Sequence, residues 1–534
     1  FQEAYKLTSV TFPNKLRELK KKIFYYCTEL TSIAFSDIDM SELVHIGEST
    51  FEYSALQSVT LPRAVTNIAD SAFTSVTSLT SFGLKYDSAR SCVLGNIHIP
   101  TSVKYITDSS FNDCGSLSSV TYGLNSQLIS IGTSSFASCP NINSALHGNH
   151  SNMLSILSNA YTNSGIHSLT IPASLEMIGD DAFSGCTNLV TIDMGGTNSS
   201  IYSSTIASNL HNIGERAFKD SSSLISIHIP DTVTAIQTET FHGCSSLHTV
   251  TIGMDSNLES IDESAFKSSG IIRINIPSGV TILEKYAFSS ASALSSVVIA
   301  DNSKLRSIEE EAFNSAVMLQ SIDIPDTVTN IGYKAFISCS SLANVSISTA
   351  SNLNAIGYQG FQNCVKLRSI YIPPGVSVIG DSTFSGCASL TSVIFGTDTK
   401  LYSIGVSAFE SSGLLEISIP VAVSLIPSKA FYSCTAMTQI DFPDGLMHYQ
   451  MDSNNSVVLP VPAPTPSPSN HSTPATQPTN NQNATNLPDE SNIARRMLQN
   501  QASSSYLANV GPNAFEKSGL VRITFPDSVK IIDT

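Results

Sequence analysis

Residues 319–342 read LQSIDIPDTVTNIGYKAFISCSSL and contain a pattern that the chain repeats over most of its length. In this stretch Leu319, Ile322 and Ile324 are separated by polar residues, which predicts a short strand with one buried face. A Pro, a Val-x-x-Ile segment and an Ala-Phe pair follow, and Leu342 opens the next unit. The stretch therefore predicts a strand, a loop and a turn that carries an aromatic side chain.

The aromatic residue of the Ala-Phe pair serves as a marker for the repeat. From Phe218 to Phe431 successive markers are separated by 22 to 25 residues. Tyr161 takes the place of Phe in one unit and divides a gap that would otherwise be 47 residues. The 18 markers are Phe24, Phe51, Phe73, Phe111, Phe136, Tyr161, Phe183, Phe218, Phe241, Phe266, Phe288, Phe313, Phe336, Phe361, Phe384, Phe409, Phe431 and Phe515.

One such unit cannot bury its own apolar face, whereas stacked units bury a continuous core. A strand that opens as Leu-x-x-Leu-x-Leu, with a period in the low twenties, is typical of leucine-rich repeats. We therefore expect an α/β solenoid, a rod or horseshoe of about 18–19 units. Its parallel sheet should be continuous and lie on the concave face, with mostly loops and short turns or helices elsewhere. Strands about 4.8 Å apart would give a length of roughly 80–90 Å.

Three units follow the repeat pattern most closely, and their pattern resembles that of one known family. Leu224–Leu247, Leu319–Leu342 and Leu367–Leu390 follow LxSIxIPxxVxxIGxxAFxxCxxL closely. This pattern resembles the BspA-like, or Treponema pallidum type, leucine-rich repeat family. The resemblance implies a secreted or cell-surface microbial protein that adheres to host matrix proteins, host cells or other microbes. It implies no shared catalytic residue.

The units alternate between two kinds, and the alternation predicts the domain organisation. Some strands end at Ile-Pro, as at Ile324-Pro325, whereas others lead into a polar loop, as at 348–353. The Pro-rich stretch 460–490 has the composition of a disordered linker or glycosylated stalk. Phe431 and Phe515 are separated by 84 residues instead of the usual 25, so the alternation places an insertion of 59 residues in one polar loop. We expect a solenoid at 1–443, a disordered insertion at 444–505 and a resumed, truncated solenoid at 506–534. A linker between two separate solenoids is the alternative.

Charge and hydropathy exclude several classes of partner. The net charge is −16 and no basic stripe occurs, which argues against nucleic acid and gives no attraction to an anionic membrane. No apolar run reaches the roughly 18–20 residues of a membrane helix, so we expect no membrane segment in this chain. The chain begins FQEAYKLTSV and ends at KIIDT within a unit, which we interpret as a fragment or mature form without its anchor.

Nine of the ten cysteines share one position, three residues after the marker. They are Cys27, Cys114, Cys139, Cys186, Cys244, Cys339, Cys364, Cys387 and Cys434. Other units place Ser269, Ala291 or Val76 there, so the position accepts any small side chain. We therefore expect these cysteines to be buried packing residues. Disulfides between neighbouring units stay open, because they depend on the Cα separation. Cys92 lies in an irregular unit.

The sequence contains no pattern that predicts catalysis, a cofactor or a metal. No CxxC spacing occurs, and the histidines are scattered without a partnered nucleophile. The segment SDIDMSE at 36–42 lacks the Gly and the distal Glu of a calcium loop. We therefore expect neither an enzyme nor a metal site.

Binding residues are sought among the strand positions that point outward. The position before the central apolar residue is mostly Ser, and the exceptions gather late in the chain. Because concave solenoid faces bind partners, charged and aromatic exceptions are the best anchors. The predicted ligand patch is Arg273, Asn275, Asp323, Tyr371 and Glu416. The alternative is that these are ordinary solvated strand residues.

Six Asn-x-Ser/Thr motifs are candidate glycosylation sites. They are Asn149, Asn198, Asn344, Asn454, Asn470 and Asn483. Five lie in polar loops or in the insertion, whereas a glycan on Asn344 would lie on the concave face.

The function that these features predict is recognition. We expect a non-enzymatic cell-surface or extracellular adhesin that binds a protein or glycan on a host or neighbouring cell. The alternative is a structural coat or spacer that self-associates by stacking of repeats, since an open sheet edge can pair with another chain.

Overall fold

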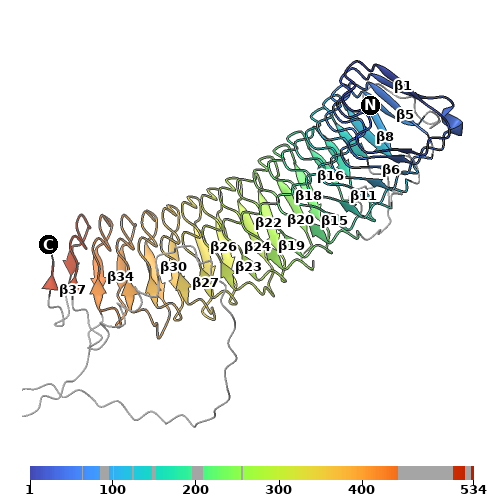
Figure 1. Cartoon of the computed structure of the whole chain (residues 1–534). Coiled ribbons are helices and arrows are strands. Elements are labelled where there is room, and N and C mark those ends of the chain that lie inside the picture. Colours follow the sequence, from blue (N-terminus) through green and yellow to red (C-terminus); the bar gives the residue numbers. More distant parts are fainter. Residues whose placement is uncertain are drawn as a thin grey trace, which may run out of the picture.

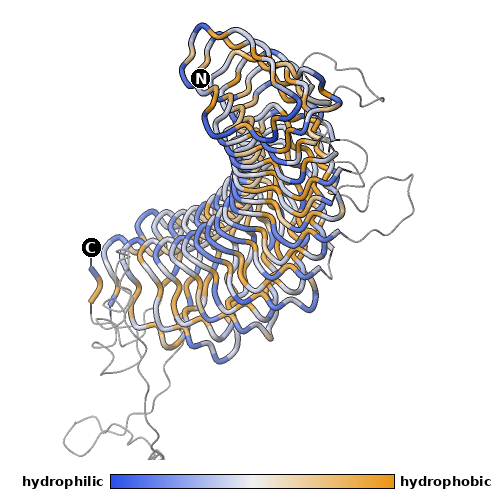
Figure 2. The backbone as a smooth tube through the Cα atoms, turned by 45° about the vertical axis from the view of Figure 1, so that its right-hand side comes forward, coloured by the Kyte–Doolittle hydropathy of each residue, from blue (hydrophilic) through white to orange (hydrophobic). Residues whose placement is uncertain are grey.

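The computed structural model describes residues 1–62, 64–84, 96–99, 101–122, 126–146, 152–194, 208–253, 256–442, 509–523 and 531–533. The chain forms a curved rod of stacked coils, with its two termini at opposite ends (Figure 1). The predicted solenoid is confirmed. Figure 2 shows the bend of the stack between its two ends.

Each regular coil contributes a first strand, formed by the alternating segment of the repeat. The first strands are β1 (Ser9–Phe12), β3 (Ser32–Phe35), β5 (Ser58–Leu61), β7 (Ser81–Leu84), β8 (Asn96–Ile99), β10 (Ser119–Tyr122), β12 (Ser144–Leu146), β14 (Ser168–Thr170), β16 (Thr191–Asp193), β18 (Ser226–Ile229), β20 (Thr249–Ile252), β22 (Arg273–Ile276), β24 (Ser296–Ile299), β26 (Ser321–Ile324), β28 (Asn344–Ile347), β30 (Ser369–Ile372), β32 (Ser392–Phe395), β34 (Glu416–Ser418), β36 (Gln439–Asp441) and β38 (Arg522–Ile523). They pair in parallel, in the order of the chain. The predicted continuous sheet is interrupted in the later half, between β24 and β26, β28 and β30, and β32 and β34.

The Val-x-x-Ile segment forms a second, shorter strand that the sequence pattern did not predict. The second strands are β2 (Glu18–Leu19), β4 (His45–Ile46), β6 (Asn67–Ile68), β9 (Tyr105–Ile106), β11 (Ser130–Ile131), β13 (Ser155–Ile156), β15 (Met177–Ile178), β17 (Asn212–Ile213), β19 (Ala235–Ile236), β21 (Ser260–Ile261), β23 (Ile282–Leu283), β25 (Ser307–Ile308), β27 (Asn330–Ile331), β29 (Ala355–Ile356), β31 (Val378–Ile379), β33 (Ser403–Ile404), β35 (Leu425–Ile426), β37 (Asn509–Val510) and β39 (Ile531–Ile532). In the described part of the chain the one helix is a 3₁₀ turn, η1 (Ile38–Met40).

The alternation of two kinds of unit is also visible in the hydrogen bonds of the first strands. An Ile-Pro strand and the polar-loop strand after it pair along four residues, as β22 with β24 and β26 with β28. The reverse junction is weaker: β20 and β22 share one residue pair, and the ladder is interrupted between β24 and β26. The two-unit period of the sequence is therefore also the pairing period of the sheet.

The marker aromatics form one stack through the core. Neighbouring rings, from Phe1 and Phe24 to Phe431 and Phe515, have centroids 5.1 to 5.8 Å apart and planes within 20° of parallel. Tyr161 lies in the stack as predicted, and its hydroxyl is 3.3 Å from that of Tyr122. The stack explains why every regular coil carries an aromatic residue at this position.

The turn around each marker is held by the next coil. The residues two before and two after the marker have positive φ, as in Lys334 (55°) and Ser338 (60°). Their N–H groups and that of Phe336 donate to carbonyl oxygens of the following coil at 2.7 to 3.0 Å. This third row of hydrogen bonds satisfies the backbone where there is no strand.

One coil is irregular, as the sequence indicated. β7 and β8 both lie between β5 and β10 in the first-strand sheet, whereas β6 pairs directly with β9 in the second. Phe82 on β7 fills the space with its ring edge-on to Phe73 and Phe111, at 5.2 and 5.1 Å.

The predicted insertion, 444–505, lies outside the described residues and stays a prediction. The coils before and after this stretch pair directly with each other. β36 pairs with β38, β35 pairs with β37, and Phe515 stacks on Phe431 at 5.8 Å.

Candidate ligand-binding surface

Each first strand presents two positions outward and two inward. On β22 Arg273 is exposed and Asn275 is half-buried, whereas Ile274 and Ile276 are buried. This alternation follows from the two-residue period of a strand, and it repeats along the sheet. The outward positions of the first strands form the outer face, on which a partner can bind.

The structure places all five predicted patch residues on the outer face but does not bring them together. Arg273 and Asn275 lie on β22, Asp323 on β26, Tyr371 on β30 and Glu416 on β34. Six strand spacings separate β22 from β34, about 29 Å. The register partners of these residues are Ser296, Val298, Ser346, Ile394 and Gln439, so no two of the five pair directly.

Tyr371 is the aromatic member of this row, and it packs onto the neighbouring coil. Its hydroxyl lies over Gly396, where an added Cβ would be 2.7 Å from that oxygen and 2.6 Å from Cδ of Pro374. Its register partner Ile394 keeps 55% of its surface exposed. The pair forms an apolar spot on the outer face.

The outer face differs between the two halves of the rod. On β1, β3 and β5 the first outward residue is an exposed Ser, namely Ser9, Ser32 and Ser58. The strands between β5 and β22 add His98, Asp193 and His228. From β22 onward charged, amide, aromatic and aliphatic outward residues are more frequent. The later half is thus the chemically more varied one.

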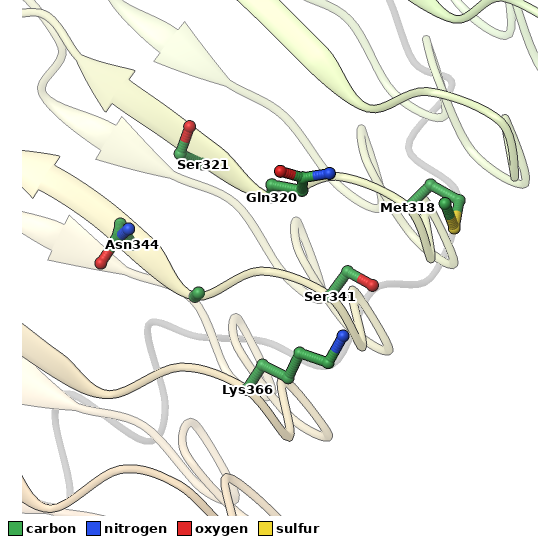
Figure 3. A pocket seen from close by; sticks show the side chains of 7 residues that line it. Met318, Gln320, Ser321, Ser341, Asn344 and Lys366 are labelled. Atoms are coloured by element: carbon green, nitrogen blue, oxygen red, sulfur yellow. The ribbon is translucent and has the colours of Figure 1, made fainter.

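A hollow that sequence reasoning missed lies at the start of β26 and β28. It has a volume of about 460 Å³ and is lined by Met318, Gln320, Ser321, Ser341, Ala343, Asn344 and Lys366. Figure 3 shows that its side chains come from three successive coils. Ala343 is shorter than Gln320 and Arg368, which precede the strands of the coils on either side. A short residue between two long ones is the signal that could have found it.

Basic side chains beside the hollow are not neutralised within the coils around it. Lys366 and Arg368 are exposed, and among the described ion pairs neither has a carboxylate partner. Arg216, by contrast, contacts Asp181 at 2.9 Å. Lys366 and Arg368 can therefore offer N–H donors to an acceptor on a ligand.

The glycosylation candidates fall on both sides of the described boundary. Asn344 lines the hollow, and it and Ser346 are exposed on β28. The other candidates, Asn149, Asn198, Asn454, Asn470 and Asn483, lie outside the described residues.

The repeat matches a family model along the chain. The model of the BspA type leucine-rich repeat region, in six copies, matches residues 1–89, 85–211, 211–343, 354–454 and 477–534. The chain belongs to the BspA-type leucine-rich repeat family. No curated protein matches the sequence.

Solved structures of other leucine-rich repeat proteins are similar to this BspA-type chain. A Bacteroides ovatus protein is 22% identical over 72% of this chain and 92% of that one, with a TM-score of 0.54. A leucine-rich cell surface protein of Faecalibacterium prausnitzii is 23% identical over 73% and 88%, with a TM-score of 0.33. The Treponema pallidum leucine-rich repeat protein is 27% identical over 35% and 76%, with a TM-score of 0.28. The first of these shows a shared fold.

The cysteines of this BspA-type chain are packing residues, as predicted. The nine described cysteines are buried with free thiols, and Cys92 lies outside the described residues. Each thiol donates to the carbonyl of the stacked aromatic residue in the preceding coil, as Cys339 to Phe313 at 3.1 Å. Burial raises the pKa of Cys339 to about 12. Because the thiolate is the nucleophile, these thiols are poor reactants.

The described coils contain neither a metal-binding cluster nor a membrane helix. Within the ranges given above, no group of three or more His, Cys, Asp or Glu side chains is placed to hold a metal ion. The segment 36–42 folds around η1, where Asp37 accepts the N–H of Asp39. The described part of the BspA-type chain contains no helix that could span a membrane.

Proposed function

We propose that the chain is a non-enzymatic extracellular adhesin that binds a protein or glycan partner on a host or neighbouring cell. The site is the outer face from β22 to β34, with the hollow near its middle. The observation that carries this proposal is the contrast along one face, from the small Ser, Thr and Ala side chains of β1, β3 and β5 to the larger and charged side chains around a hollow. Solenoid proteins use such extended faces for binding.

The side chains of this face supply the contacts that interfaces need. Tyr371 and Ile394 offer an apolar anchor, and Tyr is enriched among residues that dominate binding energy. Lys366 and Arg368 offer charge-assisted hydrogen bonds to a carboxylate or sulfate. Asn344 adds an amide at the hollow. A partner with an acidic group beside an apolar surface fits this arrangement.

One of the candidate glycosylation sites, Asn344, lies on the same face. If Asn344 carries a glycan, the hollow holds the chain's own sugar and a partner binds at Tyr371 and Ile394 alone. Mass spectrometry of the chain from its own cells distinguishes these two states.

The test is binding of the full chain to arrays of matrix proteins, glycans and cells. The variant Lys366→Ala/Arg368→Ala/Tyr371→Ala should bind at least tenfold more weakly than the wild type. The control variant, Thr11→Ala/Thr60→Ala, changes the same face in the first coils, on β1 and β5, and should bind normally. Equal losses in both variants, or no binding by the wild type, would contradict the proposal.

A further inference from the structure

Two neighbouring coils near the N-terminus carry a tyrosine where other coils avoid one. Tyr26 and Tyr53 lie two residues after their markers, and both have φ of 59°. A bulky side chain is unfavourable in this left-handed region, whereas Gly, Asn and Asp are tolerated. The other coils place there Glu3, Ser75, Asp113, Ser138, Asn163, Gly185, Asp220, Gly243, Ser268, Ser290, Ser315, Ser338, Asn363, Gly386, Ser411, Ser433 and Lys517.

The two tyrosines belong to an exposed cluster outside the core. Their ring centroids are 4.8 Å apart, and Tyr25 lies 5.5 Å from Tyr26 and 6.0 Å from Tyr53. Nζ of Lys22 lies 4.9 Å from the centre of the Tyr25 ring. Tyr26 and Tyr53 keep 40% and 38% of their surfaces exposed. We name Lys22, Tyr25, Tyr26 and Tyr53 the tyrosine platform.

The platform has the chemistry of a surface that binds proline. Proline-rich segments form polyproline II helices, which dock onto clusters of exposed aromatic rings at low entropic cost. This chain contains such a sequence, PVPAPTPSP at 460–468, with Pro at every second position. We propose that the tyrosine platform binds the segment 460–468 of a second copy of this chain.

Distance favours a second copy over the same chain. The platform residues follow β2 and β4, toward the N-terminal end of the rod, and Phe442 directly follows β36, toward the C-terminal end (Figure 1). Between the coils of Phe24 and Phe431 there are 16 steps of the aromatic stack, about 75 Å along the arc. Eighteen residues separate Phe442 from Pro460, and they span at most about 60 Å. Even a fully extended linker of this length falls short of that arc. Binding within one chain would therefore need full extension along a shorter path across the bend of the rod, which costs conformational entropy.

The contact would be heterologous, because a segment of one copy meets a platform of another. Such a contact leaves one segment and one platform free in every dimer, so further copies can add. The full chain should therefore form a series of species whose mean mass rises with concentration.

The test is sedimentation velocity of the full chain over a range of concentrations. Tyr26→Ser/Tyr53→Ser installs the residue that other coils use in these turns, so the fold should be kept. A second variant replaces the five prolines of 460–468 by Ser. Both should stay monomeric while the wild type associates. The control Tyr333→Ser removes another exposed tyrosine, 40% exposed and 4.7 Å from Nζ of Lys334, and should behave as the wild type.

A mixing experiment tests the pairing itself. The tyrosine variant keeps its segment and the proline variant keeps its platform, so their mixture should form dimers and no larger species. A labelled peptide of residues 459–469 should bind the proline variant at least tenfold more tightly than the tyrosine variant. Association that persists in the tyrosine variant overturns the proposal, as does equal peptide binding. A monomeric wild type whose platform is blocked to the peptide would assign the segment to its own chain, against the second copy. The sedimentation and peptide-binding results concern the tyrosine platform and do not depend on the β22–β34 face of the proposed function.

Discussion

At the scale of single residues, the position three residues after the marker shows which features a sequence pattern predicts and which it does not. The mixture of Cys, Ser, Ala and Val predicts a small buried side chain, and that prediction is confirmed. The pattern does not reveal that the Cys thiols donate to a carbonyl, because that carbonyl belongs to the preceding coil. Ser221 makes the same bond to Phe183 at 2.9 Å, whereas the hydroxyls of Ser54 and Ser269 have no protein partner.

Ser269 and Ser221 give opposite predictions for one substitution. Ser269→Ala removes a buried hydroxyl without a partner and should stabilise the fold by about 1 kcal/mol. Ser221→Ala removes a hydroxyl that is bonded to Phe183 and should destabilise it by about 1 kcal/mol. The urea midpoint, at an unchanged slope, measures both changes. Shifts of the two variants in the same direction would show that the hydrogen bond does not decide stability here.

The buried thiols predict a loss of stability in alkali. Burial raises the pKa of Cys139, Cys339 and Cys387 to about 12 and that of Cys186 to about 11. Unfolded thiols lose their proton near pH 8.5, so the unfolded state gains stability as the pH rises from about 8.5 to 12. Each thiol can remove up to about 1.4 kcal/mol per pH unit.

Urea midpoints between pH 8 and pH 10 check this linkage. The wild type should lose more stability over this range than Cys339→Ala/Cys364→Ala/Cys387→Ala, which lacks three of the thiols. The slopes, not the absolute stabilities, are compared, because the variant also loses packing. Parallel slopes would contradict the assignment of the effect to the thiols.

At the scale of elements, the strand pattern was readable and the turns were not. The alternation of apolar and polar residues around Leu319 and Ile322 predicted the first strands, because successive side chains of a strand point to opposite faces. No comparable periodicity identifies the turn residues Lys334 and Ser338. Their positive φ is imposed by backbone hydrogen bonds to the following coil. The outward orientation of the five patch residues was readable from the same alternation, whereas the hollow depends on Ala343 in relation to two other coils.

Phe82 gives a prediction about the irregular coil. Its ring packs edge-on against both Phe73 and Phe111, which stack on each other, so Phe82→Val should cost about 2–3 kcal/mol. Val59 holds the same strand position in the preceding, regular coil and is itself buried. Val59→Phe should therefore also destabilise, by about 1–3 kcal/mol through overpacking. Thermal melting of both variants checks the pair, and a neutral Val59→Phe would show that regular coils have spare room.

At the scale of the whole molecule, the rod follows from repetition. A side chain in one coil contacts the side chain at the same repeat position in the next coil. The rows of stacked Phe, Cys and Ile residues could therefore be predicted from the sequence repeat. The domain prediction is different, because no marker of the repeat falls within 444–505. The pairing of β36 with β38 and the stacking of Phe515 on Phe431 support one solenoid with an inserted loop. The alternative, two solenoids joined by a linker, predicts separate cores.

A loop exchange decides between one solenoid and two. Residues 396–400, Gly-Thr-Asp-Thr-Lys, connect β32 to Leu401 before β33, and Leu507 holds the position of Leu401 in the last repeat. Replacing the 64 residues 443–506 by these five should leave the solenoid intact. The shorter loop should stabilise the last coils by roughly 2 kcal/mol, because closing it costs less entropy. Hydrogen exchange of the Phe431 amide, which donates to Ala514 at 3.0 Å, reports on this junction. Slower exchange is expected; faster exchange or a second unfolding transition would favour two separate solenoids.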